Sequence, residues 1–136
     1  MKRLKTYLLA VFLLSLCLPF SGCEDADINL SPEEAEEVII GKWKLIKIGL
    51  DEEHLEPVDD DRWIEFLQYK RIKNQTYKVE YNMDQECLYI NYNSENMFIY
   101  EYKFTNKKNT LTLKLIHSNA YSLGRDISIY IYRRVK

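Results

Sequence analysis

The sequence predicts an all-β fold, either an antiparallel barrel or a sandwich, and three observations support this prediction. From residue 42 onward, apolar and polar residues alternate in short runs, which is the period-two pattern of half-buried strands. Polar turn segments separate these runs at the spacing of an antiparallel sheet. The one clear helical pattern is short and precedes the first strand, so it adds a single helix to the predicted sheet.

The first 22 residues are predicted to be a leader outside this domain. Three basic residues among the first five precede an apolar run from Tyr7 to Phe20. This run is shorter than the ~20 residues that cross a bilayer, and it fits the core of a signal peptide. It ends in Phe20-Ser21-Gly22-Cys23, which resembles a bacterial lipobox with Phe in place of the usual Leu. The resemblance implies cleavage before Cys23 and lipidation of that residue; an ordinary signal peptide or an uncleaved anchor is the alternative.

Cleavage leaves 136 minus 22, or 114 residues, which suits one domain. It also removes three positive charges, so the formal net charge goes from −2 to −5. This balance excludes nucleic acid as a partner and argues against further attraction to anionic lipid. Cys17 leaves with the leader and Cys23 carries lipid, so Cys87 has no disulfide partner and no Cys-based metal site can form. In a strand-like run, Cys87 is expected in the core.

Residues 23–30 are predicted to be a flexible tether, and residues 31–136 the folded domain. The acids after Cys23 also resemble the export signal of surface lipoproteins in Bacteroidota, although a solvated linker fits them nearly as well. At the start of the domain, Ser31-Pro32-Glu33-Glu34 predicts a helix cap, with Pro at the first helical position. The helix should run to Ile40, where Gly41 ends it.

Seven strands are predicted in the domain. The leucines at 111, 113 and 115 and the isoleucines at 127, 129 and 131 alternate with polar residues or tyrosines, so both triplets are expected to face the interior. Asn106 to Asn109 is a natural hairpin loop. The predicted strands are Trp43–Ile48, Arg62–Tyr69, Thr76–Tyr81, Cys87–Tyr92, Met97–Thr105, Thr110–His117 and Ile127–Val135.

The order of these features resembles a known family. A short helix, then Gly41-Lys42-Trp43, then strands, and an arginine on the last strand are similar to the lipocalin and wider calycin pattern. "IIGKWKLIKI", "RWIEF", "NTLTLKL" and "ISIYIYRR" resemble the lipocalin-like domain of small Bacteroidota lipoproteins. The resemblance covers residues 38–136. It implies an up-and-down barrel of about 7–8 strands with a short N-terminal helix, smaller than most lipocalins.

In this family, the Trp of Gly-x-Trp closes one end of the barrel and an Arg of the last strand packs on it. Here the pair would be Trp43 and Arg133, because Arg133 shares the period-two face of the isoleucine triplet. Arg134 is the alternative if a bulge shifts the register, and both arginines would be solvated if neither faces inward.

Four aromatic residues alternate along one predicted strand: Phe98, Tyr100, Tyr102 and Phe104. They are either core residues, an outward stripe under a loop, or the ligand-lining wall that a lipocalin-like barrel implies. The opposite face of this strand is amphipathic, so the pattern alone leaves the inner side open.

The remaining candidate sites indicate neither metal binding nor catalysis. Residues 51–61 are strongly acidic but lack the spacing of an EF-hand, so they predict a solvated loop at the barrel mouth. His54 and His117 have no partner at zinc spacing. No nucleophile elbow or phosphate-binding glycine loop is present. The sequence therefore predicts no enzyme, no metal site and no cofactor.

Two functional classes follow from these predictions. The first is a lipoprotein of the outer membrane, anchored through Cys23 on the periplasmic or surface face, that binds a small apolar or amphipathic ligand in its mouth. The second is a non-enzymatic accessory subunit or inhibitor whose loops or tyrosine-rich strand face dock on another envelope protein.

Overall fold

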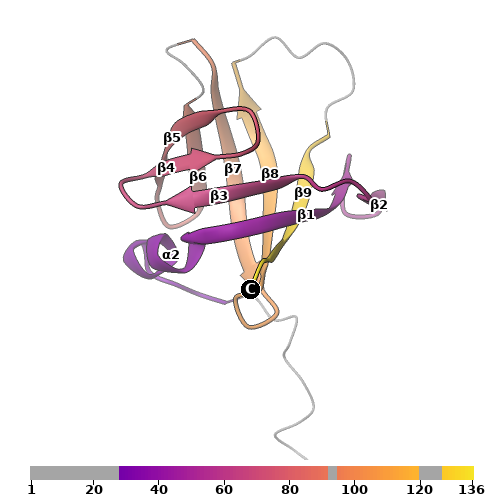
Figure 1. The fold of residues 1–136 in the computed structure, drawn as a ribbon, viewed down its shortest axis with the longest axis horizontal. Helices are drawn as coiled ribbons and strands as arrows, with labels where there is room; N and C mark the ends of the chain where they lie inside the picture. Colours follow the sequence, from indigo (N-terminus) through magenta and orange to yellow (C-terminus); the bar gives the residue numbers. More distant parts are fainter. Residues whose placement is uncertain (1–27, 92–94, 120–126) are drawn as a thin grey trace, which may run out of the picture.

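The strands form one antiparallel sheet that closes into a barrel. The computed structural model describes residues 28–91, 95–119 and 127–136. The strand order is β2-β1-β3-β4-β5-β6-β7-β8-β9, and β1 also pairs with β9, so eight strands close the barrel while β2 extends it at β1 (Figure 1). The strands are β1 (Gly41–Gly49), β2 (Leu55–Pro57), β3 (Trp63–Leu67), β4 (Arg71–Lys73), β5 (Lys78–Met83), β6 (Cys87–Asn91), β7 (Met97–Thr105), β8 (Thr110–Ser118) and β9 (Ile129–Arg134).

The predicted up-and-down barrel with a short N-terminal helix is thus confirmed. The prediction missed two strands, β2 and β4, which have only three residues each. Such short strands show barely one cycle of alternation, so the sequence pattern does not indicate them. They form because they pair with neighbouring strands. β2 lies within the acidic segment that the sequence predicts to be a loop.

Helix α2 (Pro32–Ile39) covers one end of the barrel. It begins as predicted, with Ser31 as the N-cap and its hydroxyl accepting a hydrogen bond from the amide of Glu34 at 3.2 Å. Its apolar side is fully buried through Ala35 and Ile39. Gly41 follows at a φ of 130°, a conformation that favours glycine and lets the chain turn directly into β1.

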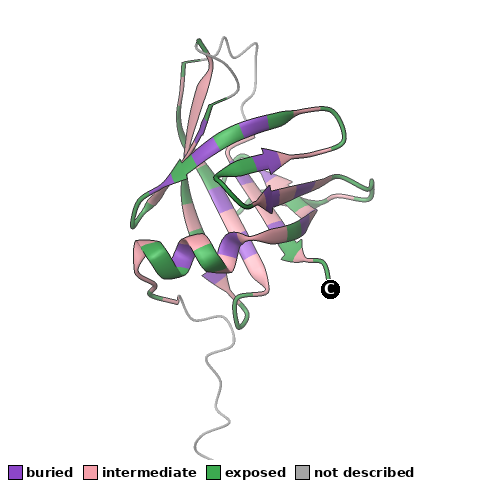
Figure 2. Ribbon diagram, turned by 60° about the vertical axis from the view of Figure 1, so that its left-hand side comes forward, coloured by how far each residue is buried: buried purple, intermediate pink, exposed green. Residues whose placement is uncertain are grey.

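Buried and exposed residues alternate along the strands (Figure 2). Leu111 and Leu113 are buried, and Leu115 packs against the core, so this predicted inner face is confirmed. The prediction for the last strand was wrong by one residue. The core contains Tyr132 with Tyr130 packed against it. Ile129 is only 2% exposed but does not belong to this core, and it is buried on the other face of β9 beside residues 50–53.

The other boundaries also differ in detail. Leu30, at the end of the predicted tether, packs against the core, so the domain begins slightly earlier. Cys87 is half-buried on the outer face of β6, because its neighbour Leu88 takes the inner position; the prediction of a core cysteine was wrong. The leader and Cys23 lie outside the described residues. No helix among the described residues is long and apolar enough to span a membrane.

Candidate functional site

The end of the barrel beneath α2 is closed by Trp43. Its ring is completely buried, and its indole Nε1 donates a hydrogen bond to the carbonyl of Ile39 at 2.8 Å. Phe104 packs on the ring with centroids 6.1 Å apart. The indole thus satisfies its single donor while its large apolar surface fills this end of the interior.

Arg134, not the predicted Arg133, packs on Trp43. The Arg134 guanidinium carbon lies 4.2 Å from the Trp43 ring centroid, and Arg133 is exposed. The correction has the same cause as that of the isoleucine triplet: the tyrosines of β9 face inward, and Arg134 continues their face. The register shift of this strand pair lies in β1, between Leu45 and Lys47, so it does not change which side chains of β9 face inward.

The Arg134 guanidinium also joins β9 to two other segments. Nη2 donates to the carbonyl of Val38 at 2.6 Å and Nη1 to that of Ile40 at 3.2 Å, both at the C-terminal end of α2. Nε and Nη2 reach the carbonyl of Lys108 in the β7–β8 hairpin at 3.3 and 3.1 Å. Burial lowers the pKa of Arg134. A Cβ at Gly41 would lie 3.3 Å from Nη1, so glycine there also makes room for the guanidinium.

The interior beyond this closed end contains a cavity of about 150 Å³. Tyr77 belongs to the turn between β4 and β5, at the end of the barrel away from Trp43, and is half-buried, which places it at the rim. The other tyrosines come from β7 and β9, and Tyr100 and Tyr130 meet edge to face at 6.2 Å. The lining consists of Tyr77, Tyr100, Tyr130, Tyr132, Ile64, Ile72, Val79, Ile90 and Leu113.

All four aromatic residues of β7 pack on the inner side, but their contacts differ. Phe104 packs on Trp43, and the Tyr102 hydroxyl donates to the carbonyl of Asp84 at 2.7 Å. Tyr100 lines the cavity, and Phe98 stacks on it with centroids 6.4 Å apart. Of the four residues predicted to bind ligand, only Tyr100 lines this internal cavity, whereas Tyr102 and Phe104 line a second concavity described below. Contact of any of them with a ligand stays a prediction.

The cavity wall combines apolar surface with hydroxyl groups that stay protonated. Burial raises the pKa of Tyr100 and, more strongly, that of Tyr132, because a phenolate would lose its hydration. A phenol is both a donor and an acceptor. The wall can therefore pack against an apolar ring and exchange a hydrogen bond with a polar group on it.

The sequence indicated Tyr100 but not the other three tyrosines. Tyr130 and Tyr132 alternate with isoleucines, so both faces of that run are apolar and period two does not choose between them. Tyr77 falls in the predicted strand Thr76–Tyr81 and alternates there with Val79 and Tyr81, but it was not singled out, and the structure places it in the turn before β5. The signal that was present is the enrichment itself, since the chain has eleven tyrosines.

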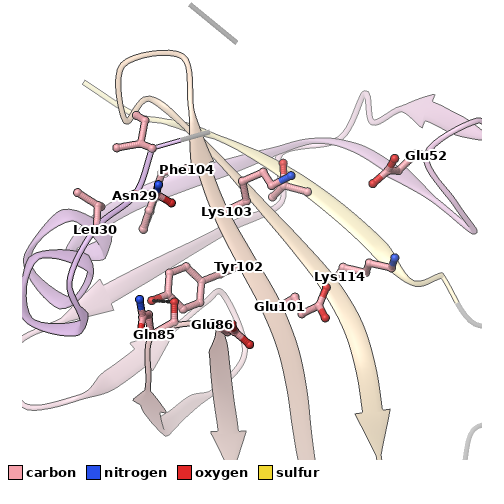
Figure 3. Close-up of a pocket in the computed structure, with 12 residues that line it drawn as sticks. Asn29, Leu30, Glu52, Gln85, Glu86, Glu101, Tyr102, Lys103, Phe104 and Lys114 are labelled. Carbon is pink, nitrogen blue, oxygen red and sulfur yellow. Dashed lines mark hydrogen bonds between the residues drawn. The ribbon is translucent and has the colours of Figure 1, made fainter. Parts of the chain in front are cut away.

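A second concavity lies on the outside of the barrel (Figure 3). It has a volume of about 530 Å³ and follows the outer faces of β7 and β8 from the segment 28–30 to Glu52. Charges of both signs line it, among them Glu86, Glu101, Lys103 and Lys114. Figure 3 shows these side chains spread along an open surface.

The acidic segment shows local interactions. His54 Nδ1 lies 2.7 Å from Asp51 Oδ1, and this contact, first among the causes, lowers the pKa of the Asp51 carboxyl. Within the described part of the chain, no three His, Cys, Asp or Glu side chains come close enough to hold a metal ion.

No model of a known protein family matches the chain, and no curated protein does either. The class of protein is therefore given by the fold alone: a small closed β-barrel with one helix over one end.

Proposed function

We propose that this protein is a lipid-anchored envelope lipoprotein whose barrel binds a small amphipathic ligand in the tyrosine-lined cavity. The observation that carries the proposal is the contrast between the two ends of the interior. Trp43, Phe104 and Arg134 fill one end, while four tyrosines surround unfilled volume toward the other. A binding pocket is typically apolar with a few convergent polar groups, and this wall has that composition.

The cavity volume limits the ligand to one ring. Pockets for drug-sized ligands measure ~300–1,000 Å³, and an apolar cavity of ~150 Å³ takes a molecule such as benzene. A tyrosine hydroxyl can both donate and accept a hydrogen bond. The wall therefore suits a ligand with one polar group, which would cost ~1–3 kcal/mol if it were buried without a partner. A phenol-like or similarly small amphipathic molecule is the class that fits.

The proposed role is binding rather than catalysis. The described residues of the cavity wall are tyrosine and aliphatic side chains, and none of them carries a carboxylate, imidazole, thiol or amine. Phenols whose pKa is raised are poor bases at neutral pH. The wall thus provides shape and hydrogen bonds but no general base.

Binding can be tested with fluorophenol as the probe and ¹⁹F NMR as the measurement, on the mature lipoprotein in nanodiscs. We expect a saturable bound signal. Val79→Phe adds a ring to the cavity wall and should abolish it, and Val79→Leu, which disturbs packing less, should weaken it. Thr112→Leu adds bulk in the outer groove and should leave binding unchanged. Equal binding by all variants, or none by the wild type, would contradict the cavity site.

The anchor has its own test. We infer lipidation at Cys23 from the leader's resemblance to a lipoprotein signal, which also implies the outer membrane. Intact-mass measurement of the protein from its own envelope should give a chain that begins at Cys23 and carries acyl groups. A Cys23→Ala variant should lack them. A mature chain with an unmodified residue 23 would contradict the anchor.

A second function, docking on another envelope protein, is favoured by one observation. The outer groove is larger than the internal cavity, and its charges of both signs suit a polar protein surface. Lys103→Glu and Lys114→Glu should then prevent recovery of one defined partner after cross-linking in cells, while fluorophenol binding persists. Unchanged cross-linking would exclude this groove as the docking surface.

A further inference from the structure

Positive charge collects at the closed end of the barrel. A shallow groove of about 460 Å³ lies there between the start of β1, the β7–β8 hairpin and the end of the chain. Among the described residues that line it there is no aspartate or glutamate, and Lys44 lies 4.0 Å from Asp61. The hairpin adds Lys107 and Lys108, both exposed. The groove is lined by Lys44, Asn106, Asn109, Arg133, Arg134, Val135 and Lys136.

The chain leaves the domain at this same end. Residues 28–30 line the outer groove together with Lys103 and Phe104 of β7, which come just before the hairpin. Only four residues separate Ile28 from Cys23. Even fully extended, this connection spans at most ~18 Å. A lipid on Cys23 therefore holds the closed end close to the membrane surface.

The hairpin is the most protruding part of this end. In Figures 1 and 2 it projects beyond α2, which carries the acidic side chains Glu33, Glu34 and Glu37. Asp51, Glu52 and Glu53 follow the far end of β1. Among the described residues, a surface that approaches along the hairpin thus meets the basic groove before the acids of α2 and of residues 51–53.

We infer that the basic groove and the hairpin dock on the phosphate groups of anionic lipid in the anchoring membrane. Docking orients the barrel with Trp43 toward the bilayer and the rim at Tyr77 toward the aqueous side. The ligand then enters from solution rather than from the membrane. The inference rests on the proposed lipidation of Cys23, and it replaces the expectation from net charge alone, because the fold separates the two signs.

The contact should depend on salt, since exposed charges are screened over ~8 Å at physiological ionic strength. The tether makes the contact local: the anchor keeps the groove within reach, so a few cations suffice to set the orientation without binding the protein by themselves.

Orientation can be measured by fluorescence quenching with headgroup spin-labelled lipid. The lipidated full protein, with Cys87→Ser, is reconstituted in phosphatidylcholine vesicles with or without phosphatidylglycerol. One label is attached at Val135→Cys, on the closed end, and another at Asn91→Cys, on the far end of β6. We expect stronger quenching at 135 than at 91 and a several-fold increase of this ratio with phosphatidylglycerol. The increase should be lost at ~1 M salt, where the screening length is ~3 Å.

Charge reversal identifies the groove. Arg133→Glu with Lys136→Glu should remove the increase caused by phosphatidylglycerol. Lys47→Glu with Lys78→Glu makes the same change in charge away from the closed end and should keep it. Equal quenching at both sites, or identical results with both lipids, would overturn the docking while leaving the anchor intact. Release of the protein from vesicles by high salt would overturn the anchor and the docking together. Fluorophenol binding is measured separately and tests neither the anchor nor the docking.

Discussion

Arg134 of β9 connects its strand to two segments that are far from it in the chain, so its removal should weaken the packing of all three. The guanidinium packs on Trp43 and donates to backbone carbonyls of α2 and of the β7–β8 hairpin. Hydrogen bonds to a charged group contribute ~1.5–3 kcal/mol and a cation–π contact ~0.5–2 kcal/mol. We expect Arg134→Ala to lower the free energy of unfolding by about 2–4 kcal/mol in urea titrations.

Arg133→Ala is the matched control, because this neighbour is exposed and should change stability by no more than about 0.5 kcal/mol. Equal losses from the two variants would contradict the role of Arg134. The pair also shows the limit of a residue-scale prediction. The sequence indicates an arginine at the end of the last strand, but Ile129 and Tyr130 are both large and apolar, so alternation does not select the inner face.

At the scale of elements, the segments with the strongest local signals were predicted best. The cap at Ser31, the leucine alternation in β8 and the hairpin at residues 106–109 each depend on neighbours in sequence, and the structure confirms them. β4 depends on pairing with β3 and β5, so its three residues gave no signal of their own. The cavity is likewise formed by residues of several strands, and the alternation along any one strand does not predict which of these residues meet.

The N-cap of α2 provides a prediction at this scale. Ser31→Ala removes the acceptor for the amide of Glu34 and leaves that donor exposed at the start of the helix. We expect a loss of about 1 kcal/mol in the free energy of unfolding. Glu37→Ala, an exposed site in the same helix, should not destabilise. A Ser31→Ala variant as stable as the wild type would show that tertiary packing of Ala35 and Ile39 alone fixes the helix.

At the scale of the whole molecule, the interior depends on keeping its tyrosines neutral. Burial raises the pKa of Tyr100 and Tyr132, and burial near Glu36 raises that of Tyr81 to about 12. An unfolded tyrosine has a pKa of ~10. Above that pH the unfolded chain loses protons that the folded chain retains, so stability declines with rising pH. Their contribution is therefore complete below pH ~10 and is lost as the pH rises toward the folded values.

The decline of the free energy of unfolding above pH ~10 tests this contribution of the buried tyrosines directly. Each buried tyrosine should lower the free energy of unfolding by about 1.4 kcal/mol per pH unit above pH ~10. Urea titrations between neutral pH and pH ~11.5 should show this decline, and Tyr100→Phe or Tyr132→Phe should each make it shallower. Tyr69→Phe, at a ring that is 92% exposed, is the matched control. If Tyr100→Phe and Tyr132→Phe left the slope of the free energy of unfolding against pH unchanged, the cavity hydroxyls would have to be hydrated. The ligand would then displace water from the tyrosines instead of entering a dry cavity.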